Sequence, residues 1–208
     1  ACHLPWIHRP LPAHLDAQVT DIWPASATEI YLATWSHGVF RRGVGGWGRE
    51  ADLRSGGVRA LWGTPDGVVW AGTHDYSLSG DVPQMGVLWR KGDAGAPWEK
   101  VPLPLKLVSI RTIRSVSWTQ DPGDVHVLGY HTPFTCALVH LSPTEGINHR
   151  LIPQTFSQCK GLWAGMHDDI WVGNYDSHLM DGPRSLYHFD GLQWRLESPD
   201  GIGSTIWN

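Results

Sequence analysis

The 208-residue sequence predicts an all-β protein made of a repeated four-stranded unit, and three features indicate this fold. First, one pattern recurs along the chain: an apolar strand ending in Trp, a tight turn, and a second apolar strand. Second, 13 Trp, 24 Gly and 15 Pro suit many short strands joined by turns. Third, the repeat period of about 40 to 50 residues is typical of propeller and solenoid arrays.

The pattern is clearest in residues 61–73, LWGTPDGVVWAGT. Related stretches start at Asp21 (DIWPASATEIYLAT), Ser115 (SVSWTQDPGDVHVLGY) and Gly161 (GLWAGMHDDIWVGN), and STIWN at 204–208 opens a further copy. Because four short strands per repeat of this length form one propeller blade, we predict a single β-propeller domain of antiparallel blades over residues 1–208. Four blades and a partial fifth are recognisable, so the propeller has five blades or belongs to a longer chain.

The strands of each predicted blade are named A to D in chain order. The blades cover 15–54, 55–106, 107–155 and 156–200, and 201–208 starts another. The first has A at Val19–Pro24, B at Ile30–Thr34, C at Gly38–Arg41 and D around Trp47; the second has Val58–Trp62, Val68–Gly72, Gly86–Arg90 and Trp98–Val101. The third has Ile113–Thr119, Val125–Gly129, Ala137–Leu141 and Ile147–Leu151, and the fourth ends with Leu186–Phe189 and a strand at Trp194.

Two further features complete the predicted architecture. Residues 1–14 contain PWIHRPLP, which is similar to the D strand that starts at Pro97, and are assigned to the outer strand of a closing blade. The A-strand tryptophans are Trp23, Trp62, Trp118, Trp163 and Trp207. The tryptophans expected to pack between blades are Trp23, Trp62, Trp163 and Trp207, with Trp70 and Trp171 of the B strands.

The net charge of the sequence limits the classes of partner, and its first residues indicate where the protein is located. A net charge of -4 and a pI near 6.3 offer no cluster of Lys and Arg for nucleic acid or an anionic membrane surface. The sequence has no apolar run long enough to span a membrane. It starts with Ala1, so we expect that a preceding export signal was removed and that the protein is secreted or at the cell surface. Ala1-Cys2 also fits the lipid-anchored junction of a bacterial lipoprotein.

The three cysteines, Cys2, Cys136 and Cys159, allow at most one bridge within the chain. A bond between Cys136 and Cys159 would join neighbouring repeats. The alternative is that both are buried free thiols. The sequence leaves these two possibilities open.

The turns between C and D strands carry a known motif in part. Asp93, Gly95 and Trp98 resemble the Asp box of sialidase-type propellers, with Lys91 and Pro97 where that motif has Ser and Thr. A second, similar turn runs from Asp190 to Trp194. The strand pattern also resembles propeller repeats of bacterial extracellular sensor domains. Both resemblances imply a propeller, but propellers host unrelated activities.

A sialidase would require three arginines for a substrate carboxylate and a Tyr paired with a Glu. The chain has Arg59, Arg111 and Arg114, but no motif pairs a Glu with a Tyr. It also lacks GxSxG, P-loop and GxGxxG signatures. We therefore expect a binding protein more than an enzyme.

The candidate site follows the B strands, because the B–C and D–A connections of a propeller share the face that binds ligands. Two residues after the aligned ends of these strands lie Trp35, His74, His131 and Tyr175. The next positions include Asp75 and Asp176, and His37 and His178 follow in their own loops.

These residues support two kinds of ligand. His74, His131, His37 and His178 could hold a single divalent metal, since imidazole is a common ligand for zinc, copper and iron. Alternatively, the rings of Trp35 and Tyr175 could stack on a sugar while Asp75 and Asp176 bind its hydroxyls. The simplest alternative is hydrogen-bonded loop histidines and a Trp35 that covers the strand ends.

A polar residue also occurs three positions before each A-strand Trp: Thr20, Arg59, Ser115, Lys160 and Ser204. Such a position is expected to face the mouth of the central channel, where Arg59 and Lys160 could bind a carboxylate or sulfate.

Three functions remain open. They are an extracellular module that binds a glycan or peptide, a metal-dependent lyase or hydrolase that uses His74, His131 and Tyr175, and an interaction scaffold for a protein partner.

Overall fold

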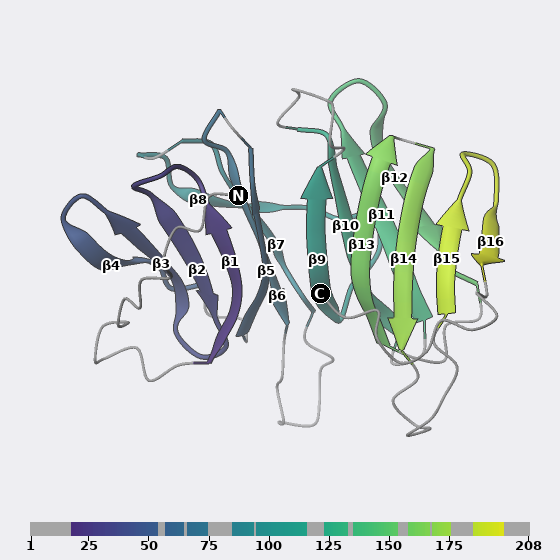
Figure 1. The fold of residues 1–208 in the computed structure, drawn as a ribbon, viewed down its shortest axis with the longest axis horizontal. Coiled ribbons are helices and arrows are strands. Elements are labelled where there is room, and N and C mark those ends of the chain that lie inside the picture. Colours follow the sequence, from purple (N-terminus) through teal and green to yellow (C-terminus); the bar gives the residue numbers. More distant parts are fainter. Residues whose placement is uncertain are drawn as a thin grey trace, which may run out of the picture.

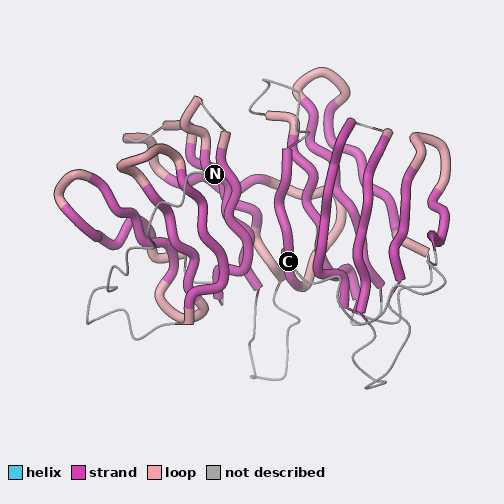
Figure 2. The backbone as a smooth tube through the Cα atoms, viewed as in Figure 1, coloured by secondary structure: helices cyan, strands magenta, loops and turns pink. Residues whose placement is uncertain are grey.

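A computed structural model describes residues 18–53, 57–64, 66–74, 85–93, 95–115, 123–132, 135–153, 158–166, 168–175 and 185–197. In these residues the chain forms strands and loops and no helix, as Figure 2 shows. The prediction of an all-β, antiparallel protein is therefore confirmed. None of the described residues belongs to a helix long and apolar enough to cross a membrane. The predicted outer strand at 1–14 and the further copy at 201–208 lie outside the described residues.

The described strands form four antiparallel meanders, in each of which every strand pairs with the next. The first comprises β1 (Val19–Pro24), β2 (Ile30–Thr34), β3 (Gly38–Gly43) and β4 (Gly46–Ala51). The second comprises β5 (Gly57–Gly63), β6 (Val69–His74), β7 (Leu88–Lys91) and β8 (Trp98–Val101). The third comprises β9 (Ser109–Ser115), β10 (Val125–Thr132), β11 (Thr135–Ser142) and β12 (Gly146–Leu151). The fourth comprises β13 (Gln158–Met166), β14 (Asp169–Tyr175), β15 (Ser185–Phe189) and β16 (Trp194–Glu197).

The meanders follow one another in a curved row that is organised by their first strands. β1 contacts β5, β5 contacts β9, and β9 contacts β13. Figure 1 shows these four strands near the middle of the molecule, with β4 and β16 at its two ends. One bridging pair, His74 with Ser109, joins the second and third meanders into an eight-stranded sheet.

Apolar side chains fill the space between each meander and the next. Because successive side chains of a strand point to opposite faces, an inner meander can bury both of its faces. In β5, for example, Leu61 packs toward the first meander while Ala60 belongs to the cluster shared with the third. In β10, Val127 faces the second meander and Leu128 the fourth. The two inner meanders therefore hold most of the core.

One covalent link and one ion pair between neighbouring meanders reinforce these contacts. Cys136 of β11 and Cys159 of β13 form a disulfide between the third and fourth meanders, so of the two possibilities that the sequence left open the structure has the bridge. Lys91 at the end of β7 forms an ion pair with Glu50 of β4, which joins the first two meanders. The Lys91 side chain is only 3% exposed, so this pair lies in the interior.

The first strand of the third meander differs from the prediction. It was expected at Ile113–Thr119; the described strand begins at Ser109 and extends to Ser115, and positions 116–119 lie outside the described residues. Arg114 pairs with His126 just as Trp62 pairs with Trp70, so Arg114 occupies the place that was assigned to Trp118. The prediction was wrong here because it aligned the copies on Trp, and this strand has a cation at the equivalent position. The Arg114 guanidinium lies 5.0 Å from the centroid of the Trp62 ring, where a cation is attracted by the ring face.

The repeated tryptophans pack as predicted in the first half of the chain. The rings of Trp23 and Trp62 lie 4.7 Å apart between centroids and are tilted by 45°, across the boundary of the first two meanders. Trp70 is buried in the core. Trp163 is instead 52% exposed on β13, which is the first strand of the fourth and last described meander. The surface around Trp163 is therefore not covered by another described strand.

The Asp-box-like turns have a structural role. The Asp93 carboxylate accepts hydrogen bonds from the backbone N–H groups of Gly95 and Ala96, at 2.9 and 2.8 Å. Asp190 does the same for Leu192 and Gln193, at 3.1 and 3.0 Å. These bonds close the β7–β8 and β15–β16 turns, and those to Gln193 and Leu192 lower the pKa of Asp190.

Candidate functional site

In all four meanders, the start of the first strand and the end of the second strand lie at the same edge of the molecule. The register pairs Val19 with Thr34, Gly57 with His74, Ser109 with Tyr130, and Gln158 with Tyr175. This is the lower edge in Figure 1. Residues that follow the second strands and residues that begin the first strands are therefore close enough to form one site.

Each first strand is interrupted by a β-bulge at an equivalent position. The register skips one residue between Val19 and Asp21, between Val58 and Ala60, and between Cys159 and Gly161. In β9 the partners change from Thr112 to Ile110, which leaves one residue unpaired as well. The bulged residues are Thr20, Arg59, Arg111 and Lys160. Bulges commonly redirect a side chain at the edge of a sheet.

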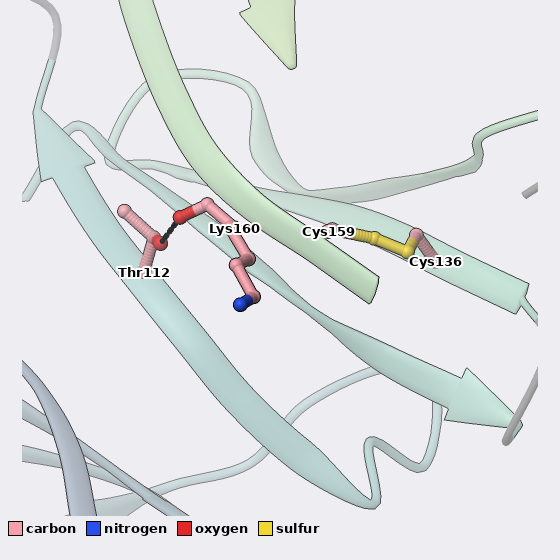
Figure 3. Close-up of a disulfide and its surroundings, with 4 residues drawn as sticks. All are labelled: Thr112, Cys136, Cys159 and Lys160. Atoms are coloured by element: carbon pink, nitrogen blue, oxygen red, sulfur yellow. Dashed lines mark hydrogen bonds between the residues drawn. A yellow bond between two sulfur atoms is a disulfide. The ribbon is translucent and has the colours of Figure 1, made fainter. Parts of the chain in front are cut away.

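The four bulged residues line a single pocket with Gln18 and Val19. Its volume is about 280 Å³. Three of its side chains are cationic and come from three different meanders, and no carboxylate is present among its described lining residues. Figure 3 shows Lys160 and the disulfide on opposite sides of β13, with the Lys160 side chain on the side that faces β9. We call this site the cationic pocket.

Neighbouring groups hold the cations in place. The Arg59 guanidinium lies 3.6 Å from the centroid of the Trp35 ring, and Arg111 lies 5.4 Å from that of Tyr130. The Trp35 ring in turn stacks on His74, with centroids 5.6 Å apart. The hydroxyl of Thr112 donates to the carbonyl of Lys160 at 3.1 Å, which ties β13 to β9 (Figure 3).

A glycine is required beside this stack. A Cβ atom on Gly57 would lie 2.6 Å from Cε3 of Trp35, and 2.5 Å from the Trp35 carbonyl oxygen. A larger residue would therefore displace the ring that supports Arg59. Trp35 thus packs against Arg59, His74 and the Gly57 backbone, and its predicted stacking on a sugar stays a prediction.

The crowded cations alter the proton affinities around them. Burial, and then the charges of Arg59 and Arg111, lower the pKa of His74 to about 4. Burial and Arg111 also lower the pKa of Lys160. His74 is therefore neutral at pH 7, and its cationic surroundings disfavour a metal ion there.

The depressed pKa of His74 predicts a pH-dependent stability. Because the unfolded chain takes up the proton near pH 6.5 and the folded chain only near pH 4, the unfolded state binds more protons in this window. The contribution of neutral His74 to stability is fully present above pH 6.5. The free energy of unfolding is expected to fall by about 2 to 3 kcal/mol as the pH drops to 4. Urea denaturation across this range measures the loss, and His74→Gln is expected to reduce it. If the free energy of unfolding of His74→Gln falls with pH as steeply as that of the wild type, groups other than His74 cause the loss of stability.

The other predicted site residues contact neighbouring groups or lie outside the described residues. The Nδ1 atom of His131 lies 2.8 Å from the carbonyl of Lys106, and that of His37 lies 2.6 Å from the hydroxyl of Ser36. Asp75, Asp176 and His178 are not among the described residues, and only the backbone of Tyr175 is placed, at the end of β14. A four-histidine site that includes His178 therefore stays a prediction.

Sequence reasoning found most of the cationic pocket and missed one residue. Thr20, Arg59 and Lys160 were predicted to face the mouth of a channel, and they line one pocket, while the binding of a carboxylate or sulfate by Arg59 and Lys160 stays a prediction. Ser115 was predicted to belong with them and does not line the pocket, whose third-meander member is Arg111. The cause is again the alignment on Trp118, which shifted the third copy by four residues. Ser204 lies outside the described residues.

A second candidate site lies near the opposite edge of the third meander. Asp124, His126 and His140 have ligand atoms that all lie within 4.8 Å of one another, so this group could hold a metal ion. No other such group of three His, Cys, Asp or Glu side chains occurs among the described residues. It includes none of the histidines that the sequence analysis selected.

The comparison with known proteins adds no family. The sequence matches no model of a protein family and no curated protein. The functional argument therefore rests on the geometry of the two sites.

Proposed function

We propose that the protein is an extracellular β-propeller module that binds an anionic group of a glycan or peptide in the cationic pocket. The observation that carries this proposal is the convergence of Arg59, Arg111 and Lys160 from three meanders, at equivalent bulges, with no described carboxylate among them. An acidic sugar or a peptide carboxylate carries the charge that such a group of cations attracts. No catalytic step is required.

Electrostatics support an anion as the ligand. Two like charges 4 Å apart repel by about 1 kcal/mol in water and by about 4 kcal/mol at the lower effective dielectric near a protein surface. The pKa of Lys160 is lowered first by burial and then by the charge of Arg111, so repulsion between these two cations contributes to the shift. An anion relieves this repulsion, and arginine can bind a carboxylate or sulfate through two parallel hydrogen bonds.

The architecture supports the propeller. Successive four-stranded antiparallel meanders whose first strands contact each other in chain order are the arrangement expected of propeller blades around an axis. In such an array the cationic pocket would lie at the mouth of the central channel. The disulfide supports an oxidising compartment, which is consistent with an exported protein.

The enzyme and scaffold alternatives have less support among the described residues. His74, which the enzyme alternative used as a ligand or acid and base, is neutral and surrounded by arginines. The half-exposed Trp163 on β13 is compatible with a protein partner or a further blade, but no described residue identifies either of them. We therefore retain the binding module as the proposed function.

Titration with sulfate, glucuronate and glucose tests the proposal. We expect the wild-type protein to bind sulfate and glucuronate but not glucose, and Arg111→Gln to weaken binding by about tenfold or more, because hydrogen bonds to charged groups contribute about 1.5 to 3 kcal/mol. Arg195→Gln is the control, because Arg195 is an exposed arginine of the fourth meander that pairs with Asp190. Equal binding of glucose and glucuronate, or unchanged affinity in Arg111→Gln, would contradict an anion site.

A further inference from the structure

Each meander carries an equivalent set of side chains near the edge opposite the cationic pocket. In the register, an aromatic or imidazole ring of the second strand is paired with a basic residue of the third strand, and the residue two positions before the ring completes the set. The sets are Glu29, Tyr31 and Arg41; Val68, Trp70 and Arg90; Asp124, His126 and His140; and Asp169, Trp171 and His188.

Two of these sets show the structural role of the position. In the fourth meander the Asp169 carboxylate accepts hydrogen bonds from the Trp171 indole at 2.9 Å and from His188 at 3.0 Å. The Trp171 and His188 rings are stacked, with centroids 4.1 Å apart. In the first meander Glu29 likewise accepts hydrogen bonds from Tyr31 and Arg41. The acid thus ties the aromatic ring to the base across two strands.

The third meander departs from this pattern in a specific way. His126 replaces the bulky aromatic ring and is buried, with 1% of its surface exposed. His140 lies 2.8 Å from Asp124, and the two imidazole rings are parallel, with centroids 4.3 Å apart. An imidazole buries less apolar surface than an indole or phenol, so structure alone does not favour it here. Departures from a repeated structural rule are expected at functional sites.

We propose that Asp124, His126 and His140 bind one divalent transition-metal ion, for which zinc is the best fit. Two imidazoles and one carboxylate are a ligand set that zinc accepts, with a further position left for water or another ligand. Ligand atoms that already lie within 4.8 Å of one another can be drawn together by side-chain rotation around an ion with bonds of about 2.0 to 2.2 Å. This inference is independent of the anion-binding proposal.

Metal binding requires one local rearrangement. An imidazole nitrogen directs its lone pair in the plane of its ring, and the rings of His126 and His140 are parallel to within 3°. One ring therefore has to turn about its Cβ–Cγ bond, and coordination replaces the hydrogen bond between His140 and Asp124. The change is confined to side chains, because the strands that carry the ligands are fixed by the β10–β11 pairing.

An adjoining pocket leaves room for additional ligands. Its volume is about 180 Å³, and His126 and His140 line it together with Glu145, His149 and Asp168. Glu145 lies in the β11–β12 turn and Asp168 in the β13–β14 turn. The pocket borders two of the three metal ligands, His126 and His140, so a fourth ligand can come from water or from these side chains.

The chain itself supplies variants that keep the structural pattern while removing a ligand. His126→Trp restores the residue of the second and fourth meanders, and His140→Arg restores that of the first and second. His188→Arg makes the same exchange in the fourth meander and is the matched control. The experiment titrates zinc by calorimetry, records cobalt absorption in the visible range, and follows the histidine resonances of the wild-type protein by NMR.

We expect one zinc per chain in the wild type and in His188→Arg. His126→Trp and His140→Arg should each weaken zinc binding by more than the roughly 10- to 100-fold loss that follows removal of an outer-shell partner. In the NMR spectra the zinc-induced shifts should centre on His126 and His140. Absence of stoichiometric zinc binding, unchanged affinity in both ligand variants, or zinc shifts at other histidines would overturn the proposal. If both variants fail to fold, the wild-type NMR titration decides.

Discussion

Replacement of Glu50 by Leu is expected to lower the free energy of unfolding by about 3 to 5 kcal/mol, because it leaves the charge of Lys91 in the interior without its carboxylate. The Lys91 side chain is 3% exposed and that of Glu50 is 15% exposed. Water therefore cannot replace the lost partner. Urea denaturation at pH 7 measures the change.

The double variant Glu50→Leu, Lys91→Met separates a buried charge from lost packing. Because an apolar pair of similar volume avoids the cost of burying two charges, its stability should return to that of the wild type or exceed it. The partly exposed pair of Arg49 with Asp52 provides a comparison, and Arg49→Gln should cost only about 0 to 1 kcal/mol. A small loss in Glu50→Leu, similar to that of Arg49→Gln, would show that Lys91 reaches solvent.

The strands of this protein could be predicted because each carries its own local signal. Alternating apolar residues around Trp62 and Trp70, with the intervening Asp66-Gly67 turn, indicate two antiparallel strands without reference to the rest of the chain. Gly67 has a positive φ of 94°, which glycine adopts without strain. The other Trp-containing copies repeat these signals, so the order of the meanders along the chain could also be predicted.

The third meander was harder to predict because Arg114 replaces the Trp on which the alignment relied. A bulge adds one residue to a strand, and no residue type marks it, so the register of Arg111 could not be derived from periodicity alone. Once Thr20, Arg59 and Lys160 are recognised as bulged residues, the missing member of the set is found on β9.

The Asp124 group was missed for a different reason. Its three ligands are not clustered in a motif, since His126 lies on β10, Asp124 directly before it, and His140 on β11. A signal was present nonetheless: His126 stands where the second and fourth copies have Trp70 and Trp171. A search for the position at which one copy departs from the others would have selected His126.

Removal of the disulfide, in the double variant Cys136→Ala, Cys159→Ala, is expected to lower the free energy of unfolding by about 3 to 4 kcal/mol. The two cysteines are 23 residues apart in the sequence, and closing a loop of this size restricts the unfolded chain by an amount in this range. Both residues are also fully buried, so the alanines leave small cavities that add to the loss. Thermal or urea denaturation measures it, with Cys2→Ser as the control that keeps the disulfide.

The same variant should weaken anion binding, because Lys160 directly follows Cys159 on β13. The disulfide holds this strand against β11 while Thr112 holds it to β9, and together these contacts direct Lys160 toward the cationic pocket. Loss of the covalent link lets the start of β13 move and separates Lys160 from Arg59 and Arg111. We therefore expect lower affinity for sulfate in the folded double variant, measured at a temperature well below its unfolding transition. Unchanged sulfate affinity together with reduced stability would show that the Thr112 hydrogen bond and the β13–β14 pairing position Lys160 without the disulfide.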